Sequence, residues 1–225
     1  MGTVYDEILE PVVFPKMYKF RQKFADDKIN DIEAHIIKEI TSFPNIDLVK
    51  GHTVALAVGS RGIRNIAMIV KTVVETLRKH GATVFIVPAM GSHGGAIASN
   101  QTKILEHLGV TEKSMCVEIH SSMDTEIIGY TDDGVPVHMD TNACSADYTI
   151  TIARIKPHSS FRGKYESGML KMCVIGLGKQ HGADFCHLQG MENMGRNIEK
   201  IGKVFIEKSN LLSTISINDN VSDSK

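Results

Sequence analysis

The sequence lacks the features that mark several large classes of protein. Its 225 residues include no tryptophan, and the eight Phe and five Tyr residues offer little for a platform on which nucleic acid bases stack. The formal net charge is -1, so Lys and Arg are not in excess to neutralise a phosphate backbone. These two absences argue against a nucleic-acid-binding protein.

Paired cysteines and long apolar runs are also missing. None of the four cysteines forms a C-x-x-C pair, which argues against a zinc knuckle or a thioredoxin-type motif and predicts reduced thiols. The N-terminus lacks a basic stretch followed by an apolar one, and no apolar run approaches the roughly 20 residues that a membrane span needs. The sequence therefore predicts a cytoplasmic protein without membrane association.

The composition is that of a globular protein, with 42% hydrophobic and 23% charged residues. We divide it into an N-terminal preface, residues 1–50, packed on a main domain, residues 51–225. In the preface, residues 12–14 and 17–20 have the pattern of a short strand pair, and residues 29–40 have one apolar helical face.

Strand and helix patterns alternate along the main domain. Residues 53–60 and 82–91 are apolar runs that end in glycine or serine, as is typical of parallel strands covered on both faces. Further strands are predicted at 115–119, 148–153 and 211–217, and helices at 66–77 and 100–108. A hairpin at 126–139 turns on Asp133-Gly134. The predicted fold is α/β, with a largely parallel sheet flanked by helices, a β-hairpin and a mixed edge.

Three loops with ionisable residues follow predicted strands. Arg61 comes after the first strand, His93 lies in the Met-Gly-Ser-His-Gly-Gly loop after the second, and His158 follows Pro157 after the 148–153 strand. Ligands of open α/β sheets bind beyond the carboxyl ends of strands, so we expect these side chains to face one crevice. An arginine suits a carboxylate or phosphate, and histidines suit proton transfer. The alternative is a surface arginine and idle, solvent-facing histidines.

Residues 156–187 are rich in glycine, lysine and histidine. Lys171 stands among apolar residues, a setting that favours a nucleophile or attachment point, although a lysine that reaches out to solvent is the alternative. The glycines at 176, 178 and 182 suggest a backbone cradle for phosphate or a flexible connection. His187 is a candidate ligand for a borderline metal such as nickel.

Taken together, these loops resemble the N-terminal domain of the nickel-pincer lactate racemase family, the nickel-dependent 2-hydroxyacid racemases and epimerases. The resemblance covers about residues 54–187. It is carried by the Ser60-Arg61 loop, the His93 loop, Pro157-His158 with Phe161 and Gly163, Gly168 with Lys171, and His187.

The resemblance implies an isomerase, a racemase or epimerase of a small 2-hydroxyacid. Its cofactor is a nickel-pincer nucleotide, a pyridinium mononucleotide with thioamide and thiocarboxylate arms that grip nickel. Lys171 corresponds to the lysine that carries the cofactor, and His187 to the histidine that completes the nickel coordination. His93 and His158 correspond to the two histidines that exchange the substrate hydroxyl proton, and Arg61 to a substrate-binding arginine.

The sequence also departs from the family pattern. Met169-Leu170 precede Lys171 where lactate racemase itself has a Gly-Gly-Arg run, which leaves Lys179 as a competing attachment site. The second domain of the family has no counterpart in these 225 residues, so we expect the chain alone to be inactive or to need association with another chain, for example as a homo-oligomer. Which 2-hydroxyacid is turned over stays open.

Two other functions remain as alternatives. The glycine-rich segment could belong to a non-catalytic domain that binds a nucleotide or another anion, without nickel. The histidines could instead surround an open zinc or nickel site of a metal-dependent hydrolase with a water nucleophile.

Overall fold

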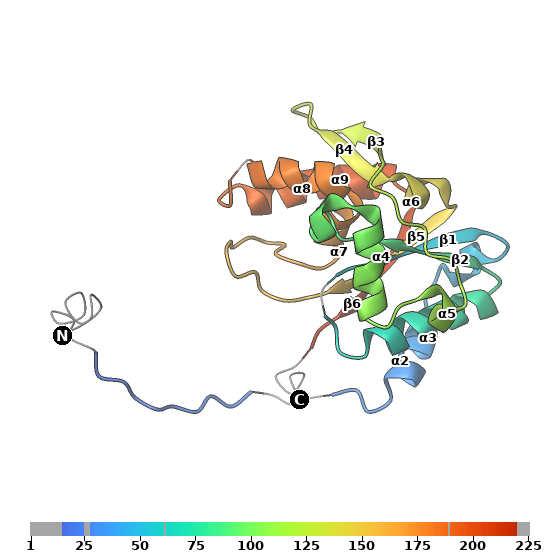
Figure 1. Ribbon diagram of the computed structural model, residues 1–225, viewed down its shortest axis with the longest axis horizontal. Helices are drawn as coiled ribbons and strands as arrows, with labels where there is room; N and C mark the ends of the chain where they lie inside the picture. The colour runs from blue at the N-terminus through green and yellow to red at the C-terminus, as the bar shows by residue number, and fades with distance from the viewer. Residues whose placement is uncertain (1–14, 25–27, 61, 189, 220–225) are drawn as a thin grey trace, which may run out of the picture.

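The fold is built around a four-stranded parallel sheet. The computed structural model of the chain describes residues 15–24, 28–60, 62–188 and 190–219. The strands are β1 (Thr53–Val58), β2 (Thr83–Pro88), β5 (Tyr148–Arg154) and β6 (Leu211–Ile217), in the order β2-β1-β5-β6. All four strands were predicted from their apolar patterns, and the α/β class with a parallel sheet is confirmed (Figure 1).

Helices cover both faces of this sheet (Figure 1). On one face lie α2 (Ile32–Thr41) and α3 (Ile66–Lys79); on the other lie α7 (Met169–Lys171), a π-helix (Met172–Leu177), α8 (Lys179–Leu188) and α9 (Met194–Lys208). The remaining helices are α4 (Ala98–His107), α5 (Glu112–Met115), α6 (Thr141–Ser145) and two 3-10 turns, Ile46–Val49 and His93–Ala96.

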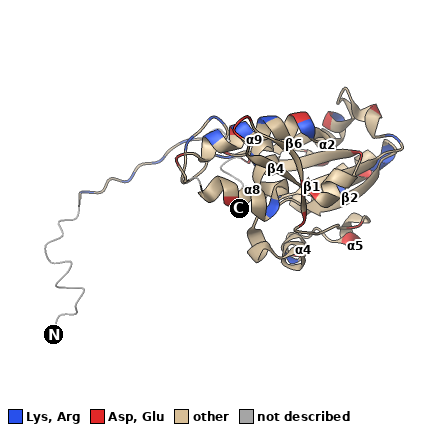
Figure 2. Cartoon of the chain, turned by 90° about the horizontal axis from the view of Figure 1, so that it is seen from above, with Lys and Arg blue, Asp and Glu red and all other residues tan. Residues whose placement is uncertain are grey.

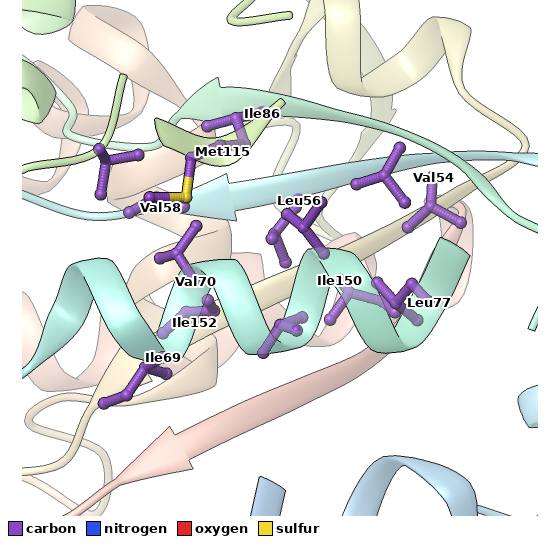
Figure 3. Close-up of a cluster of buried hydrophobic side chains, with 14 of the residues drawn as sticks. Val54, Leu56, Val58, Ile69, Val70, Leu77, Ile86, Met115, Ile150 and Ile152 are labelled. Atoms are coloured by element: carbon purple, nitrogen blue, oxygen red, sulfur yellow. The ribbon is translucent and has the colours of Figure 1, made fainter. Parts of the chain in front are cut away.

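Alternation along β1 divides its side chains between two cores. Val54, Leu56 and Val58 are fully buried on the α3 side, where they meet residues such as Ile152 (Figure 3). Ala55 and Ala57 are buried on the opposite side, beneath the helices that follow Gly168. Because alanine is small, the helices on that side can approach the sheet closely at the ends of the strands.

The predicted hairpin forms as β3 (Thr125–Tyr130) and β4 (Pro136–Asp140), with Gly134 at a φ of 81° in the turn. It is a separate two-stranded antiparallel sheet rather than an antiparallel edge of the main sheet. Gly129 lies close to Val204, so the hairpin packs on α9. The main sheet is therefore parallel throughout its described strands.

Two short strand predictions differ from the structure. Most of the predicted 115–119 strand is absent: α5 begins in a capping box between Thr111 and Ser114, and only Ile119 forms a bridge, to Ile86. The local capping hydrogen bonds outweigh the short apolar run. Residues 17–20 lie in extended chain outside any sheet, and their predicted partner, residues 12–14, is outside the described residues.

All four cysteines are free thiols, as predicted, and burial raises the pKa of Cys144 and of Cys173 to about 12.

Within the described ranges, none of the helices has both the length and the apolar character that a bilayer crossing requires.

Candidate active site

The His93 loop is held in a fixed shape at the end of β2. Gly91, Gly94 and Gly95 have φ values of 59°, 70° and 70°, a region that favours glycine. The buried amide of Gln101, on α4, donates to the carbonyl oxygens of Gly91 at 2.9 Å and His93 at 3.1 Å. His93 is thus an exposed side chain on a backbone tied to α4.

A hydrogen bond joins this loop to the loop after β1. The hydroxyl Oγ of Ser60 lies 2.5 Å from Nδ1 of His93. A hydroxyl can donate or accept, so His93 can adopt either neutral tautomer. When Ser60 accepts from Nδ1–H, the Nε2 atom of His93 is unprotonated and can take a proton.

His158 is held differently, by a carboxylate and a backbone amide. The Glu166 carboxylate accepts from the N–H of His158 at 2.8 Å and from the N–H of Gly163 at 3.2 Å. The N–H of Ser160 donates to Nδ1 of His158 at 3.1 Å. Since a backbone amide only donates, Nδ1 is unprotonated here and the proton of the neutral ring sits on Nε2. Nε2 of His93 can therefore accept a proton, whereas Nε2 of neutral His158 carries one.

Phe161 connects His158 to Lys171. The rings of His158 and Phe161 lie 4.3 Å apart between centroids, and Nζ of Lys171 lies 5.5 Å from the centroid of the buried Phe161 ring. Lys171 also interacts electrostatically with Cys186, although burial is the larger effect and raises the pKa of that thiol to about 11. Cys186 immediately precedes His187, an exposed residue in the last turn of α8. Phe161 thus contacts both His158 and Lys171, and Lys171 acts electrostatically on the residue that precedes His187.

The strand-end loops also pack on the helical segment that carries Lys171. A Cβ added to Gly59 would lie 3.4 Å from the side chain of Met172, and one added to Gly91 would lie 3.1 Å from the carbonyl oxygen of Ile175. The ends of β1 and β2 therefore adjoin the residues that follow Lys171.

The glycines at 176, 178 and 182 are explained by close packing against the protein itself. A Cβ on Gly176 would lie 2.9 Å from the Ala89 carbonyl oxygen, and one on Gly178 or Gly182 would lie 2.1 Å from that of Val174. These positions tolerate no larger side chain without a shift of the backbone. The segment is a packed π-helix and helix start, and neither a flexible connection nor a phosphate cradle is needed to account for its glycines.

Lys179 is buried in an ion pair. Its Nζ lies 3.1 Å from Oδ2 of Asp140 and 2.5 Å from the carbonyl oxygen of Pro88, and both charged side chains are fully inaccessible to solvent. Burial lowers the pKa of Lys179 and raises that of Asp140, while the attraction between them opposes both shifts. Lys179 is therefore engaged inside the protein, whereas Lys171 is half-buried.

Similarity to known proteins identifies the family and the fold of this chain. The sequence matches the family described as "Lactate racemase N-terminal domain" over residues 15–197. This chain belongs to that family. Its fold is similar to the structure of the lactate racemase apoprotein from Thermoanaerobacterium thermosaccharolyticum, with a TM-score of 0.65 and 17% sequence identity. The similarity covers 90% of this chain and 54% of the racemase, so the chain spans about half the length of that relative. No curated protein sequence gives a significant match.

Within this lactate racemase N-terminal domain, the structure places four of the five predicted site residues. His93 is linked to the β1 loop, and His158 and Lys171 share contacts with Phe161. His187 follows Cys186, on which Lys171 acts electrostatically, in the last turn of α8. Arg61 is outside the described residues, so the predicted meeting of Arg61, His93 and His158 in one crevice stays a prediction.

Sequence reasoning missed several residues that hold the site together. Gln101 and Glu166 shape the loops of His93 and His158, and Asp140 pairs with Lys179. The hydroxyl of Ser167 accepts from the N–H of Lys156 at 2.8 Å. Most of these contacts join residues eight or more positions apart, and the pattern of neighbouring residues carries no signal of them.

Replacing Glu166 with Gln is expected to loosen the His158 loop. An amide can accept only one of the two N–H bonds and presents a donor to the other. We expect hydrogen exchange at the amides of His158 and Gly163 to rise by roughly an order of magnitude. The Glu106→Gln variant, at an exposed glutamate on α4, should leave this exchange unchanged.

The same loop should respond to acid. Both amide hydrogen bonds lower the pKa of Glu166 from its ordinary value of 4.5. The anchoring is thus complete above about pH 4.5 and is lost as the pH falls through the lower, folded-state pKa. The exchange rate of the His158 amide is first corrected for the intrinsic effect of pH on exchange. If the corrected rate stays constant through the titration of Glu166 and is the same in Glu166→Gln, Glu166 does not have this role.

Proposed function

We propose that this chain is the cofactor-binding half of a nickel-pincer-nucleotide-dependent racemase or epimerase of a 2-hydroxyacid. The observation that carries the proposal is the contact of His158 and Lys171 with the same ring, that of Phe161, together with the electrostatic effect of Lys171 on Cys186, the residue before His187. This proximity supports a site in which His158 transfers a proton, Lys171 carries the cofactor and His187 binds the metal. Membership of the lactate racemase N-terminal domain family supports the same chemistry.

The described residues fit the cofactor. Of the two candidate lysines, Lys171 is half-buried, while Lys179 is fully buried and already paired with Asp140. Of the two, Lys171 is therefore the lysine that a group in solvent can reach. No cluster of three or more His, Cys, Asp or Glu side chains within the described ranges could hold a metal by itself. A pincer group supplies the other donors and needs only one histidine, which His187 would provide.

Held by Lys171 and His187, the cofactor would supply a reversible hydride acceptor for C2 of the substrate. The chain's own residues handle the proton. His93 can present an unprotonated Nε2 because the Ser60 hydroxyl is able to accept from Nδ1, which suits removal of the substrate hydroxyl proton. His158 presents Nε2–H, which suits a hydrogen bond to the substrate oxygen on the other face.

Racemisation needs such a pair, because each face of the planar intermediate requires its own proton-transfer group. Turnover in the opposite direction reverses the two roles, and for His158 that requires the bond from the Ser160 amide to give way. Arg61 would bind the substrate carboxylate through two parallel hydrogen bonds and so orient C2. The proposal places the protein in the cytoplasm and gives it a small 2-hydroxyacid as its substrate. It includes no binding to nucleic acid or to a membrane.

The other two functions lack a specific observation in their favour. The glycines of the supposed anion cradle pack against Ala89 and Val174. A metal-dependent hydrolase would need several protein ligands around an open position, and the described residues provide no such group.

The proposal is tested by turnover of a single enantiomer. Protein produced together with the cofactor-synthesis enzymes is incubated with L-lactate, or with a panel of other 2-hydroxyacids, in D2O, and the products are separated on a chiral column. We expect the opposite enantiomer to appear with hydrogen retained at C2, because hydride leaves and returns without exchange with solvent. Deuterium at C2 of the opposite enantiomer would contradict the proposed hydride transfer. Absence of turnover by protein with full nickel and cofactor content would instead agree with the expectation that this chain needs association with another chain.

A further inference from the structure

A hollow lies away from the site, between α2, α3 and β6. Its volume is about 960 Å³, and none of His93, His158, Lys171 and His187 lines it. Apolar side chains dominate its walls: Ile32, Ile36 and Ile40 from α2, Ile69 and Val73 from α3, and Leu212 and Ile215 from β6. Ile36, Ile40, Ile69 and Val73 are buried, so the apolar surface that stays open to solvent belongs to Ile32, Leu212 and Ile215, which are partly exposed.

One wall of the hollow is an uncovered sheet edge. Among the described strands, β6 pairs only with β5, and all seven of its residues retain some exposure to solvent. Its sequence, Leu-Leu-Ser-Thr-Ile-Ser-Ile, contains no charge and no proline. Proteins normally protect such an edge with lysine, proline or a covering segment, because its free N–H and C=O groups can pair with another strand. The composition of β6 thus indicates an edge strand that another segment covers.

The N-terminal arm, residues 15–24, has the pattern of a covering strand. Tyr18, Phe20 and Phe24 stand at even positions and are 82%, 84% and 57% exposed. Lys19, Arg21 and Lys23 alternate with them over residues 18–24, where Gln22 takes the one remaining even position. A period of two gives an extended segment one apolar and one basic face, and the basic face would protect the new edge. In the structure the arm extends away from the domain, and its basic residues lie along it (Figures 1 and 2).

The arm is attached at the right place to reach β6. Three residues, 25–27, join it to Lys28 and Ile29, and these two line the hollow together with Ile217 and Asp219 at the carboxyl end of β6. An arm that folds back from this point along β6 runs parallel to it, in the direction shared by all strands of the sheet. Ten extended residues span about 33 Å, which exceeds the length of the seven-residue β6.

We propose that residues 15–24 dock on the free edge of β6 as a fifth parallel strand, with Tyr18, Phe20 and Phe24 over the hollow. The match to the family begins at residue 15, so the arm is part of the shared domain. The occupant is the chain's own arm, because a short tether gives an effective concentration on the order of millimolar, above that of a second copy in dilute solution. The inference does not depend on the proposed catalytic function.

Hydrogen exchange of the full chain tests the docking. We expect the alternate amides of residues 18–24 whose N–H groups face β6 to exchange at least about tenfold more slowly than the same amides of an unstructured peptide. The variant Phe20→Ser/Phe24→Ser, which alters the apolar face, should restore the unstructured rate. The matched variant Lys19→Ser/Lys23→Ser, which alters the basic face, should retain the protection.

Two outcomes would overturn the proposal. Exchange of the native arm at the unstructured rate would show that it does not dock. Protection that increases across a roughly hundredfold range of protein concentration, in step with a dimer mass in light scattering, would assign the hollow to the arm of a second copy. Protection that is independent of concentration and sensitive only to the apolar-face variant supports docking within one chain.

Discussion

Replacing Lys179 with Met is expected to lower the free energy of unfolding by about 3–5 kcal/mol, because removal of one partner leaves a buried charge without compensation. Asp140 is fully inaccessible to solvent, and Lys179 is its partner at 3.1 Å. Lys179 also binds the Pro88 carbonyl oxygen, so its loss frees the start of α8 from the end of β2. Equilibrium unfolding in urea measures the change.

The double variant Lys179→Met/Asp140→Asn provides the control. Asp140 also caps α6 by accepting from the N–H of Ala143 at 2.8 Å, and an asparagine oxygen can keep that bond. The double variant removes the stranded charge and should recover most of the lost stability. If Lys179→Met alone unfolds at the wild-type urea concentration, the pair is not the buried, closely coupled pair described above.

Replacing His93 or His158 with Ala is expected to reduce racemisation by about 10²–10⁴-fold, the usual contribution of a positioned acid or base. Neither residue is proposed to hold the cofactor, so nickel content and the modification of Lys171 should stay at wild-type levels. Chiral chromatography gives the rate, and metal analysis with peptide mass spectrometry gives the cofactor content.

A histidine outside the site serves as the matched control. His107 lies in the last turn of α4, where its Nδ1 contacts the Lys103 carbonyl oxygen at 2.6 Å. His107→Ala should leave racemisation unchanged. Full activity in both the His93 and the His158 variants would show that the proton-transfer assignment is wrong, and loss of nickel in either would indicate a role in binding instead.

The parallel sheet could be predicted because its signal is local. The apolar runs of β1, β2 and β5 and the single apolar face of α3 each follow from the residues of one short segment. Because the carboxyl ends of parallel strands meet at one edge, the loops that hold His93 and His158 could be singled out from the same patterns.

The rest of the site depends on contacts between distant residues. The choice between Lys171 and Lys179 rests on burial: Asp140, 39 positions away from Lys179, holds that lysine inside the protein. The glycines after Ile175 had the appearance of a ligand loop, yet the backbone of Ala89 and Val174 explains them. Likewise, the capping box at Thr111 replaced a predicted strand with a turn of helix, since local hydrogen bonds outweighed a weak apolar pattern.

The most direct test of the central claim is peptide mass spectrometry together with nickel analysis, on protein produced with the cofactor-synthesis enzymes. The account predicts a mass increment on Lys171, none on Lys179, and about one nickel per chain, with the increment lost in Lys171→Ala and the nickel lost in His187→Ala. Unmodified lysines and no nickel, beside a loaded lactate racemase prepared in parallel, would contradict the assignment of this chain as a nickel-pincer domain.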